Sequence, residues 1–334
     1  MIRPWIFEFA NCTPIAGEPL FDWYFDLWEQ AERIGFEGIF FSEHHFRRIY
    51  TTPSPHLLIA ALAMRTRTLR LGVMGSVLPL HSPWRMAEEI GMLDHLTNGR
   101  LEVGYSSGVG PAETSIAGIP LDEVRPRFDA ALALIEQAIN GEPITASDQF
   151  GRFGPLETRP QPLRPLPPRW TTVLGTGSAQ AAAQRKLNIC TGFLSVAEAL
   201  KVFDAYRAAV GGDCPEKIAL RRNILIGDSN SAAAELAAIA EAGTRAEFDM
   251  ANRGGAEALV PDLPSKSPLD FMFGADEVIH GTVARVSEQI IHQCRTLGAG
   301  HMLGFVFNNI PRAAVVRNYQ LWEQVIPQLR AAKV

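Results

Sequence analysis

The run Ser42-Glu43-His44-His45-Phe46 is the strongest candidate for chemistry, and it directly follows a short apolar segment at residues 37–42. Neighbouring side chains on an extended strand point in opposite directions, so these three polar residues are poorly spaced to share one metal ion. A single imidazole can still act as a general acid, a general base or a hydrogen-bond donor. His44, His45 or both are therefore candidates to face a reaction site. The alternative is that they are histidines packed at its rim.

A second candidate is the segment Gly175-Thr176-Gly177-Ser178-Ala179-Gln180, which lies between an expected strand and an expected helix. Small residues let the backbone approach an anion, and a helix N-terminus offers free N–H groups and a positive dipole. Gln180 stands where a dinucleotide fingerprint needs its third glycine. The segment predicts a phosphate site, with a tight turn and a Ser178 N-cap as the alternative.

A third group of candidates comes from loops rich in small residues. The loop at 104–110 includes Tyr105 and Ser106, and Arg125 and Arg127 open the segment that follows it. Glycines permit a close approach of a ligand, and an arginine can pair with a phosphate, although a solvated loop with surface arginines explains the same residues. Met74-Gly75-Ser76 and Phe193 follow other expected strands, where they can form the floor and wall of a planar-ligand site or belong to the core.

Several kinds of catalysis lack their residues in this chain. There is no GxSxG, HExxH or P-loop motif, and no metal site is predicted. Schiff-base chemistry lacks a lysine at the end of any expected strand, since the five lysines are Lys186, Lys201, Lys217, Lys266 and Lys333. What remains is a set of small-residue loops, one aromatic side chain and two histidines, which suits a phosphorylated, planar redox cofactor.

The elements that must position these residues alternate along the chain. Eight β-rich segments are expected at residues 2–9, 37–42, 69–77, 100–105, 170–175, 187–193, 218–227 and 301–307. Amphipathic segments separate or follow them at about 20–34, 54–67, 83–97, 122–139, 178–185, 195–210, 282–297 and 311–330. This alternation predicts an α/β fold, a TIM (β/α)₈ barrel, with an open doubly wound sheet as the second possibility.

The 334 residues exceed the ~250 of a typical barrel, and two irregular stretches account for the difference. Residues 141–169 predict a hairpin and a Pro-rich run at the bottom rim of the barrel. Residues 228–280, which follow the seventh strand, predict a lid over the catalytic face, with an Ala-rich helix at about 231–243. We therefore expect one domain over 1–334 rather than two.

Composition limits the partners and the compartment. The net charge is −5, and the chain has no basic block of the kind that nucleic acids or anionic membranes attract. No run approaches the ~20 apolar residues of a membrane span, and no signal peptide opens the sequence. The four cysteines, Cys12, Cys190, Cys214 and Cys294, have no metal or redox spacing. A cytoplasmic protein with buried thiols is expected.

Four segments of the sequence resemble one known family. They are GFEGIFFSEHHF (35–46), LGVMGSVLPLHSPWRMAEEIGMLDHLTNGRLEVGYSSG (71–108), VLGTGSAQAAA (173–183) and, more weakly, VIHGTVARVSEQI (278–290). Together they make the chain similar to the bacterial luciferase-like flavin-dependent monooxygenases. The resemblance implies a TIM barrel that binds reduced FMN or, in one branch of the family, a deazaflavin.

The resemblance also implies roles for individual residues. His44 falls on the histidine beside the reactive edge of the flavin, where it stabilises or protonates a flavin peroxide, and His45 is its neighbour in the motif. Met74-Gly75 falls where the family often has a non-prolyl cis peptide against the ring system. Ser106 and Ser107 stand where luciferase has a cysteine and a phosphate-binding arginine, which argues against light emission. The full set of expected flavin-binding residues is Glu43, Met74, Gly75, Ser76, Tyr105, Ser106, Arg125, Gly175, Thr176, Gly177, Ser178 and Phe193.

The function implied is oxidation of a small organic substrate by reduced FMN and O2 through a flavin peroxide, with the reduced flavin supplied by a separate reductase. The EHHF form of the motif favours this reading over a deazaflavin-dependent oxidoreductase that transfers hydride. A flavin-binding protein without catalysis is a further alternative. A phosphate-binding barrel isomerase would need a paired carboxylate or a lysine at the strand ends. A homodimer packed through the helices at 54–67 and 83–97 is expected.

Overall fold

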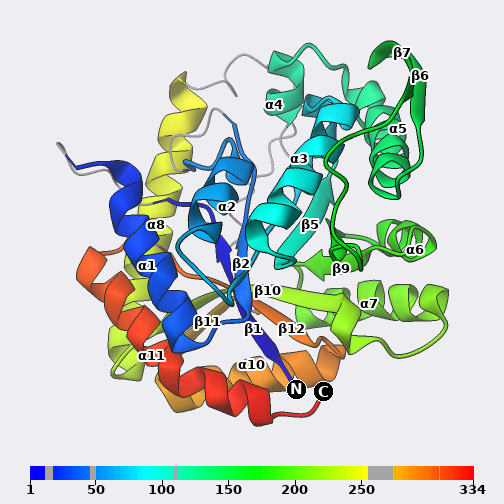
Figure 1. Cartoon of the computed structure of the whole chain (residues 1–334). Coiled ribbons are helices and arrows are strands. Elements are labelled where there is room, and N and C mark those ends of the chain that lie inside the picture. The colour runs from blue at the N-terminus through cyan, green and yellow to red at the C-terminus, as the bar shows by residue number, and fades with distance from the viewer. Residues whose placement is uncertain (12–17, 46–49, 109–110, 255–273, 275, 308) are drawn as a thin grey trace.

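Parallel strands form a closed barrel with helices around it (Figure 1). The computed structural model describes residues 1–11, 18–45, 50–108, 111–254, 274, 276–307 and 309–334. Within them, eight strands follow one another around the barrel in the order β10, β12, β1, β2, β3, β5, β8 and β9, and β9 pairs with β10. This last pairing closes the sheet, which confirms the TIM barrel and excludes the open doubly wound alternative. The barrel strands are β1 (Arg3–Glu8), β2 (Gly38–Phe41), β3 (Arg70–Val73), β5 (Leu101–Ser106), β8 (Arg169–Thr172), β9 (Asn188–Thr191), β10 (Ile218–Ile226) and β12 (His301–Phe305).

The helices lie outside the sheet and bury one stripe each against it. In α1, for example, the buried residues Tyr24, Leu27, Trp28 and Ala31 recur every three or four positions, and the helix ends at Gly35, whose φ is 99°. The helices are α1 (Leu20–Ile34), α2 (Pro55–Ala63), α3 (Pro83–Thr97), α4 (Pro111–Ile116), α5 (Leu121–Ile139), α6 (Thr176–Gln184), α7 (Val196–Val210), α8 (Asn230–Gly254), α10 (Val283–Leu297) and α11 (Arg312–Ala331).

The third predicted strand, residues 69–77, is wrong as one continuous element. It consists of β3 and the short strand β4 (Ser76–Val77), because the chain turns at a cis peptide bond between Met74 and Gly75. β4 then pairs with the end of β5, where Ser76 lies opposite Tyr105. A Cβ at Gly75 would lie 2.7 Å from the backbone of Tyr105, so only glycine allows this approach.

Other predicted boundaries also differ from the structure. The fifth strand ends at Thr172 rather than at 175, and α6 begins at Thr176 rather than at 178, because Gly175 already caps the helix. The helix predicted at 54–67 ends at Ala63, and the Ala-rich helix predicted to end at 243 continues as α8 to Gly254. The short helix α4 and the strand β11 (Val278–Gly281), which pairs with β10, were not predicted.

The insertion at 141–169 contains an antiparallel pair, β6 (Ile144–Asp148) and β7 (Gly151–Leu156). The Pro-rich run that follows packs against the last turns of two helices: the Leu163 amide donates to Asp94 in α3, and the Gln161 amide donates to the Ala138 carbonyl in α5. Both helix ends lie beside the amino ends of the barrel strands. Most of the second insertion, residues 255–273 and 275, lies outside the described residues.

Aromatic side chains fill the lower part of the barrel. The Trp5 indole donates to His301 Nδ1 at 2.9 Å, and the Trp170 indole donates to the Glu102 carboxylate at 2.5 Å. All four side chains are buried, so this end of the barrel is closed to solvent. A ligand site is therefore expected at the opposite end, at the carboxyl ends of the strands. None of the described helices is both long and apolar enough to cross a membrane.

Candidate active site

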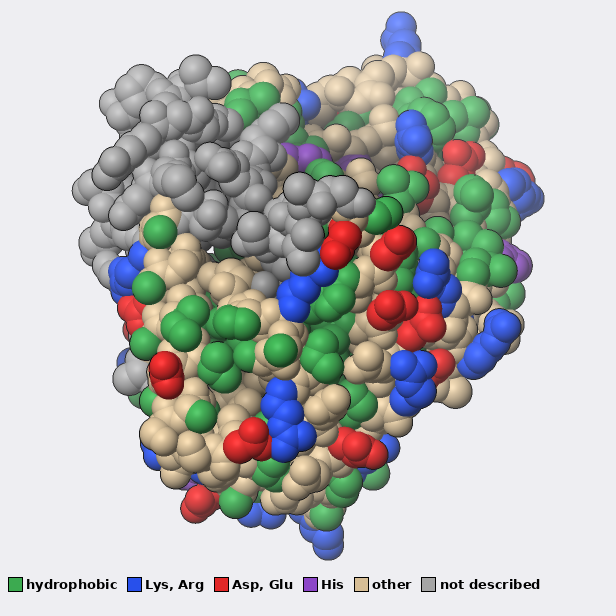
Figure 2. Space-filling model, turned by 90° about the vertical axis from the view of Figure 1, so that its left-hand side faces the viewer, with side chains coloured by type: hydrophobic (Ala, Val, Ile, Leu, Met, Phe, Trp, Pro, Cys, Tyr) green, Lys and Arg blue, Asp and Glu red, His purple; other side chains and the backbone are tan. Residues whose placement is uncertain are grey.

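A cavity of about 440 Å³ opens at the carboxyl ends of the barrel strands. Figure 2 shows histidine side chains inside a depression near the top of the molecule, and on the same face acidic and basic groups are interspersed. Of the residues proposed from sequence, Glu43, His44, Met74, Gly75, Ser106 and Phe193 line this cavity. The rest of its lining is largely apolar and comes from Phe7, Phe9, Tyr50, Val77, Val173, Leu174 and neighbouring residues.

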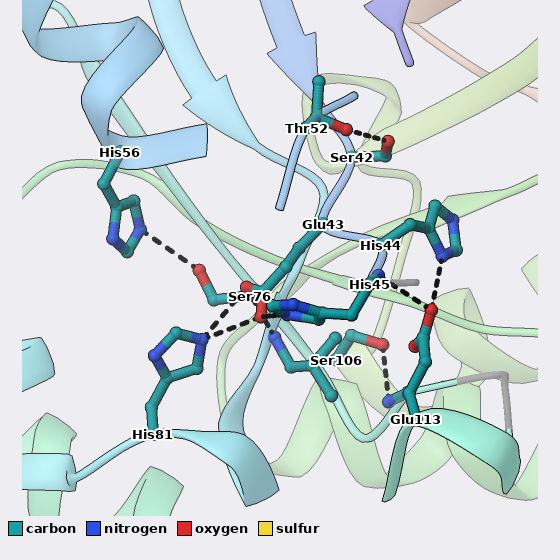
Figure 3. Close-up of polar contacts among 12 residues, drawn as sticks. Ser42, Glu43, His44, His45, Thr52, His56, Ser76, His81, Ser106 and Glu113 are labelled. Atoms are coloured by element: carbon teal, nitrogen blue, oxygen red, sulfur yellow. Dashed lines mark hydrogen bonds and ion pairs between the residues drawn. The ribbon is translucent and has the colours of Figure 1, made fainter. Parts of the chain in front are cut away.

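His44 is held at the cavity wall by contacts on several sides. Its ring stacks on Phe9 at a centroid distance of 5.6 Å and lies 4.9 Å from the Tyr50 ring. Its Nδ1 lies 3.3 Å from the Glu113 carboxylate, which also accepts the His45 backbone N–H at 3.0 Å (Figure 3). With Nδ1 engaged by Glu113, the second ring nitrogen of His44 is the one available to a ligand.

His45 turns the other way and does not line the cavity. Its Nε2 lies 3.0 Å from Glu43, whose carboxylate is also 2.8 Å from His81 Nε2 and accepts the Val77 backbone N–H at 3.1 Å (Figure 3). Burial opposes the ionisation of Glu43, but the hydrogen bonds from His45 and His81 outweigh it and lower its pKa to about 2. The bond to Glu43 in turn raises the pKa of His45. Glu43 is thus an ionised anchor that joins the ends of β2 and β4.

We expect Glu43→Gln to lower the free energy of unfolding by about 3 kcal/mol near pH 5.5, since a folded-state pKa of about 2 against a usual value of 4.5 corresponds to this energy. Because the pKa is lowered in the folded state, the contribution is present above pH 4.5 and is lost as the pH falls toward 2. The difference between wild type and variant should shrink by about 1 kcal/mol between pH 5.5 and pH 3.5. Urea unfolding at both pH values measures it.

The matched control is Glu157→Gln. The Glu157 side chain is 60% exposed, and its ion-pair partner among the described residues is Arg159. The free energies of unfolding of this variant and of the wild type should differ by less than ~0.5 kcal/mol at both pH values. If Glu43→Gln were equally harmless, the carboxylate would not be the anchor that its contacts indicate.

Ser76 lies beside the cavity but faces away from it. Its hydroxyl is 3.2 Å from His56 Nε2, and His56 Nδ1 is 3.0 Å from the Glu89 carboxylate, so Ser76 belongs to a chain of contacts between β4, α2 and α3. The hydrogen bond from His56 is the largest influence on Glu89 and lowers its pKa to about 2. The residues next to Ser76 face the other way: Gly75 and Val77 line the cavity wall.

The segment 175–178 forms the first turn of α6, directly after the cavity residues Thr172, Val173 and Leu174. Ser178 Oγ donates to the Gly175 carbonyl at 2.8 Å. The predicted Ser178 N-cap is wrong, because Gly175 is the N-cap and Ser178 is the third residue of the helix. A Cβ built on Gly175 or on Gly177 would meet no atom within 4 Å, so the space beside these glycines is open. The Gly175 N–H donates to Ser178 Oγ at 3.3 Å, so the candidate donors to a phosphate are the N–H groups of the helical turn that follows it.

Besides Ser76 and residues 175–178, two further predicted cofactor contacts lie outside the cavity lining. Tyr105 is fully buried, and its hydroxyl donates to Glu136 in α5 at 3.0 Å. The Arg125 side chain is 52% exposed, forms an ion pair with Asp129 and lies over the Phe128 ring. The Ser106 hydroxyl does line the cavity, where it accepts the Gly108 backbone N–H at 3.0 Å (Figure 3). Phe46 and residues 109–110, which belong to predicted motifs, lie outside the described residues.

Phe193 meets a buried ionic cluster that was not predicted. Its backbone has a φ of 63°, and its N–H donates to the Glu277 carboxylate at 2.8 Å. The same carboxylate pairs with Arg221, which lies 4.5 Å from the Phe193 ring, and with Arg222 at 2.9 Å. The sequence did hold one signal of this cluster, because two adjacent arginines interrupt an otherwise apolar strand at 218–227.

Glu113 was missed for a different reason. It lies in α4, a helix of six residues whose sequence PAETSI has no apolar period, and it reaches His44 from 69 positions away along the chain. No local pattern could identify such a contact. Among the described residues, no group of three or more His, Cys, Asp or Glu side chains is arranged to hold a metal ion. The described cysteines Cys190, Cys214 and Cys294 are buried and unbonded.

Comparison with known proteins gives two kinds of match. The family model of luciferase-like monooxygenases matches residues 10–301. The uncharacterized protein y4wF of Sinorhizobium fredii is 34% identical over 294 residues, which cover 85% of this chain and 84% of that protein. The oxygenase component of the flavin-dependent trigonelline monooxygenase of Acinetobacter baylyi is 31% identical over 173 residues, which cover 51% of this chain and 48% of that enzyme.

A solved structure shows the same fold. The oxygenating constituent of 3,6-diketocamphane monooxygenase from Pseudomonas putida, a type II Baeyer–Villiger monooxygenase in complex with FMN, superposes with a TM-score of 0.77. The match covers 97% of this chain and 96% of that one at 20% sequence identity. At this identity the likeness supports the barrel itself.

Proposed function

The chain belongs to the luciferase-like monooxygenase family, and from this premise we propose that it uses reduced FMN and O2 to oxidise a small organic substrate. A separate reductase would supply the reduced flavin, as the name "oxygenase component" implies for the trigonelline enzyme. The single observation that carries the proposal is the cavity at the strand ends, where His44 and the Met74–Gly75 turn face the same apolar space.

The residues present fit a phosphorylated flavin. The glycines at the start of α6 leave open space for a phosphate, and the cavity next to them is lined by aromatic and aliphatic side chains that suit a planar ring system. The Met74–Gly75 turn and Phe193 would contact the rings. Once bound, reduced flavin supplies the electrons that activate O2.

The chain itself would position a proton and exclude water. His44, oriented through Glu113, presents one ring nitrogen to the cavity, where it can donate a hydrogen bond or a proton. The surrounding phenylalanines Phe7 and Phe9 keep that part of the cavity apolar, which strengthens the interaction and limits side reactions with water.

The test begins with cofactor choice. The full-length protein is titrated with reduced FMN and, separately, with a reduced deazaflavin under anaerobic conditions; tighter binding of FMN is expected. With NADH, an FMN reductase and O2, an oxygenated product should then form from a panel of aldehydes, cyclic ketones and aromatic acids. Preference for the deazaflavin would support the hydride-transferring alternative. FMN binding with H2O2 alone from every compound would support a flavin-binding protein without oxygenation.

We also propose a homodimer formed through α2 and α3. Their outer faces expose large apolar side chains: Leu57 is 72% exposed, Met64 65% and Met92 53%, and Trp84 and Leu96 lie on the same helix as Met92. An apolar surface of this kind on a water-soluble barrel is typical of a face that packs against a second copy.

Replacement of Met92 by glutamate is expected to shift the protein from dimer to monomer, because a charge at the centre of an apolar interface has no partner there. Sedimentation at micromolar concentration should give about 73 kDa for the wild type, twice the 36.6 kDa chain, and the chain mass for the variant. Ile239→Glu, at a position on α8 that is 42% exposed, is the control and should stay dimeric. A monomeric wild type would disprove the proposal.

A further inference from the structure

Arg221 is a buried cation in the wall of the cavity with most of its hydrogen-bonding capacity unused. The residue lies on β10, is 2% exposed and lines the cavity. Of its three guanidinium nitrogens, one pairs with Glu277, whereas Nε and the second terminal nitrogen have no hydrogen-bond partner among the described residues. Buried donors are almost always paired in folded proteins, so two unpaired donors on one cation indicate an absent partner.

The charges around Arg221 do not cancel. Glu277 is shared between Arg221 and Arg222, and both guanidinium groups are buried, which leaves an excess of one positive charge in this cluster. The second arginine uses another of its donors on Gln293 in α10, so it is directed away from the cavity. Burial lowers the pKa of Arg221, but a guanidinium stays protonated at neutral pH. An anion in the cavity would compensate the remaining charge.

The end of β9 brings a glycine rather than a further donor to the side of Arg221. Thr191, the last residue of β9, lies opposite Leu220 in the pairing of β9 with β10, so its side chain points to the other face of the sheet from that of Arg221. A Cβ at the adjacent Gly192 would lie 2.8 Å from Arg221 Cδ, so the arginine stem crosses β9 at this point.

The position of Arg221 in the barrel separates it from the Met74–Gly75 turn, although Phe193, the other expected ring contact, lies 4.5 Å from the guanidinium. In the closed ring of strands, β10 lies four strands from β3 in either direction, and β3 leads into the Met74–Gly75 turn. A ring system packed on that turn would leave Arg221 on the opposite side of the mouth. Between them the wall is formed by apolar groups such as Phe7 and Phe193, whose rings flank the guanidinium.

We propose that Arg221 forms a carboxylate-binding subsite, and that the substrate is an organic acid with an apolar body. The guanidinium offers two parallel N–H donors, the geometry that matches the two oxygens of a carboxylate. Glu277 is a positioning residue that fixes the guanidinium from the side away from the ligand. The assignment of the bound acid as the substrate rests on the proposed monooxygenase function, whereas the subsite itself does not.

The test uses calorimetric titration of the full-length protein, without flavin, with 2-naphthoate and with its neutral analogue 2-naphthamide. The wild type should bind the carboxylate about tenfold or more tightly than the amide. Arg221→Gln should bring the two affinities within about twofold of each other. Arg221→Lys keeps the charge without the two parallel donors, so its preference should lie between those of the wild type and of Arg221→Gln. Thr172→Val, a threonine of the cavity lining, should leave the preference unchanged.

Equal affinity of the wild type for the two compounds overturns the proposal, and so does an equal loss of preference in Thr172→Val and Arg221→Gln. Titration of each variant with reduced FMN separates this outcome from a failure of the proposed function. If the protein binds FMN but shows no preference for the carboxylate, the subsite is rejected and the proposed function is not. If it prefers the carboxylate but does not bind FMN, the proposed function is rejected and the subsite is not. A tenfold loss of FMN affinity in Arg221→Gln would show that the guanidinium contacts the cofactor, which also rejects the proposal.

Discussion

Replacement of Glu277 by glutamine is expected to lower the free energy of unfolding by about 3–5 kcal/mol, which would be the largest stability loss from a single charge removed in this barrel. The carboxylate is 2% exposed and lies between Arg221 and Arg222, which are themselves 3% and 0% exposed. Without it, two buried guanidinium groups remain in an apolar environment with no compensating charge. Urea unfolding at pH 7 measures the loss.

Glu277 also holds the Phe193 backbone in place. The Glu277 carboxylate also accepts the Phe193 N–H, and the positive φ of Phe193 is an unusual conformation for a residue with a side chain. Glutamine can keep this bond through its carbonyl oxygen, so the loss in Glu277→Gln should come mainly from charge. Glu277→Asp keeps the charge, shortens the side chain and should be less damaging than Glu277→Gln. If Glu277→Asp lost more free energy of unfolding than Glu277→Gln, the shape of the side chain rather than its charge would determine the stability of this region.

A double-mutant cycle checks the same interpretation. If Arg221 and Glu277 interact, the double variant Arg221→Met with Glu277→Gln should lose less free energy of unfolding than the two single variants lose together, by about 1 kcal/mol or more. If the two losses were strictly additive, the interaction between the two side chains would contribute nothing to stability. In that case the stability of this region would come from the surrounding aromatic rings.

The barrel could be predicted because its signal is distributed along the whole chain. Strands and helices alternate, and each boundary is marked by local chemistry such as the Ser195 cap of α7 or the glycine that ends α1. Errors occurred where tertiary contacts override local propensity. The predicted strand at 69–77 breaks because Gly75 must fit against the β5 backbone, and no property of residues 69–77 alone requires this.

The candidate site could be predicted only in part. Residues that follow a strand directly, such as His44 and Met74, could be placed at the barrel mouth from topology alone. The directions of individual side chains could not, because they depend on partners that are distant in sequence. Glu113 and Glu277 reach the site from a short helix and from the end of an insertion, and each sets the orientation of a residue in the cavity wall.

The last expected result separates the two adjacent histidines, which the sequence could not distinguish. His44→Gln should reduce the formation of oxygenated product about 100-fold or more, the usual effect of removing a group that donates or accepts a proton at the reacting atoms. His45→Gln should reduce it less than about fivefold. The structure gives the reason, because His44 lines the cavity, whereas His45 is bonded to Glu43 and lies outside the lining.

The measurement is the yield of oxygenated product and of H2O2 per reduced FMN consumed, for the best substrate of the panel. In His44→Gln the electrons should appear as H2O2, while the affinity for reduced FMN stays within about threefold of the wild type, since the binding residues are unchanged.

In His45→Gln the product yield should be kept, and the free energy of unfolding should fall by about 1 kcal/mol because Glu43 loses one of its three donors. Glu113→Gln tests the orientation of His44: it should lower the yield of oxygenated product and leave the affinity for reduced FMN unchanged, because it weakens the contact that holds the imidazole at the cavity wall. If His45→Gln lost the product and His44→Gln kept it, the assignment of the two histidines would be reversed, and Glu43 with His45 would be the pair that acts on the substrate.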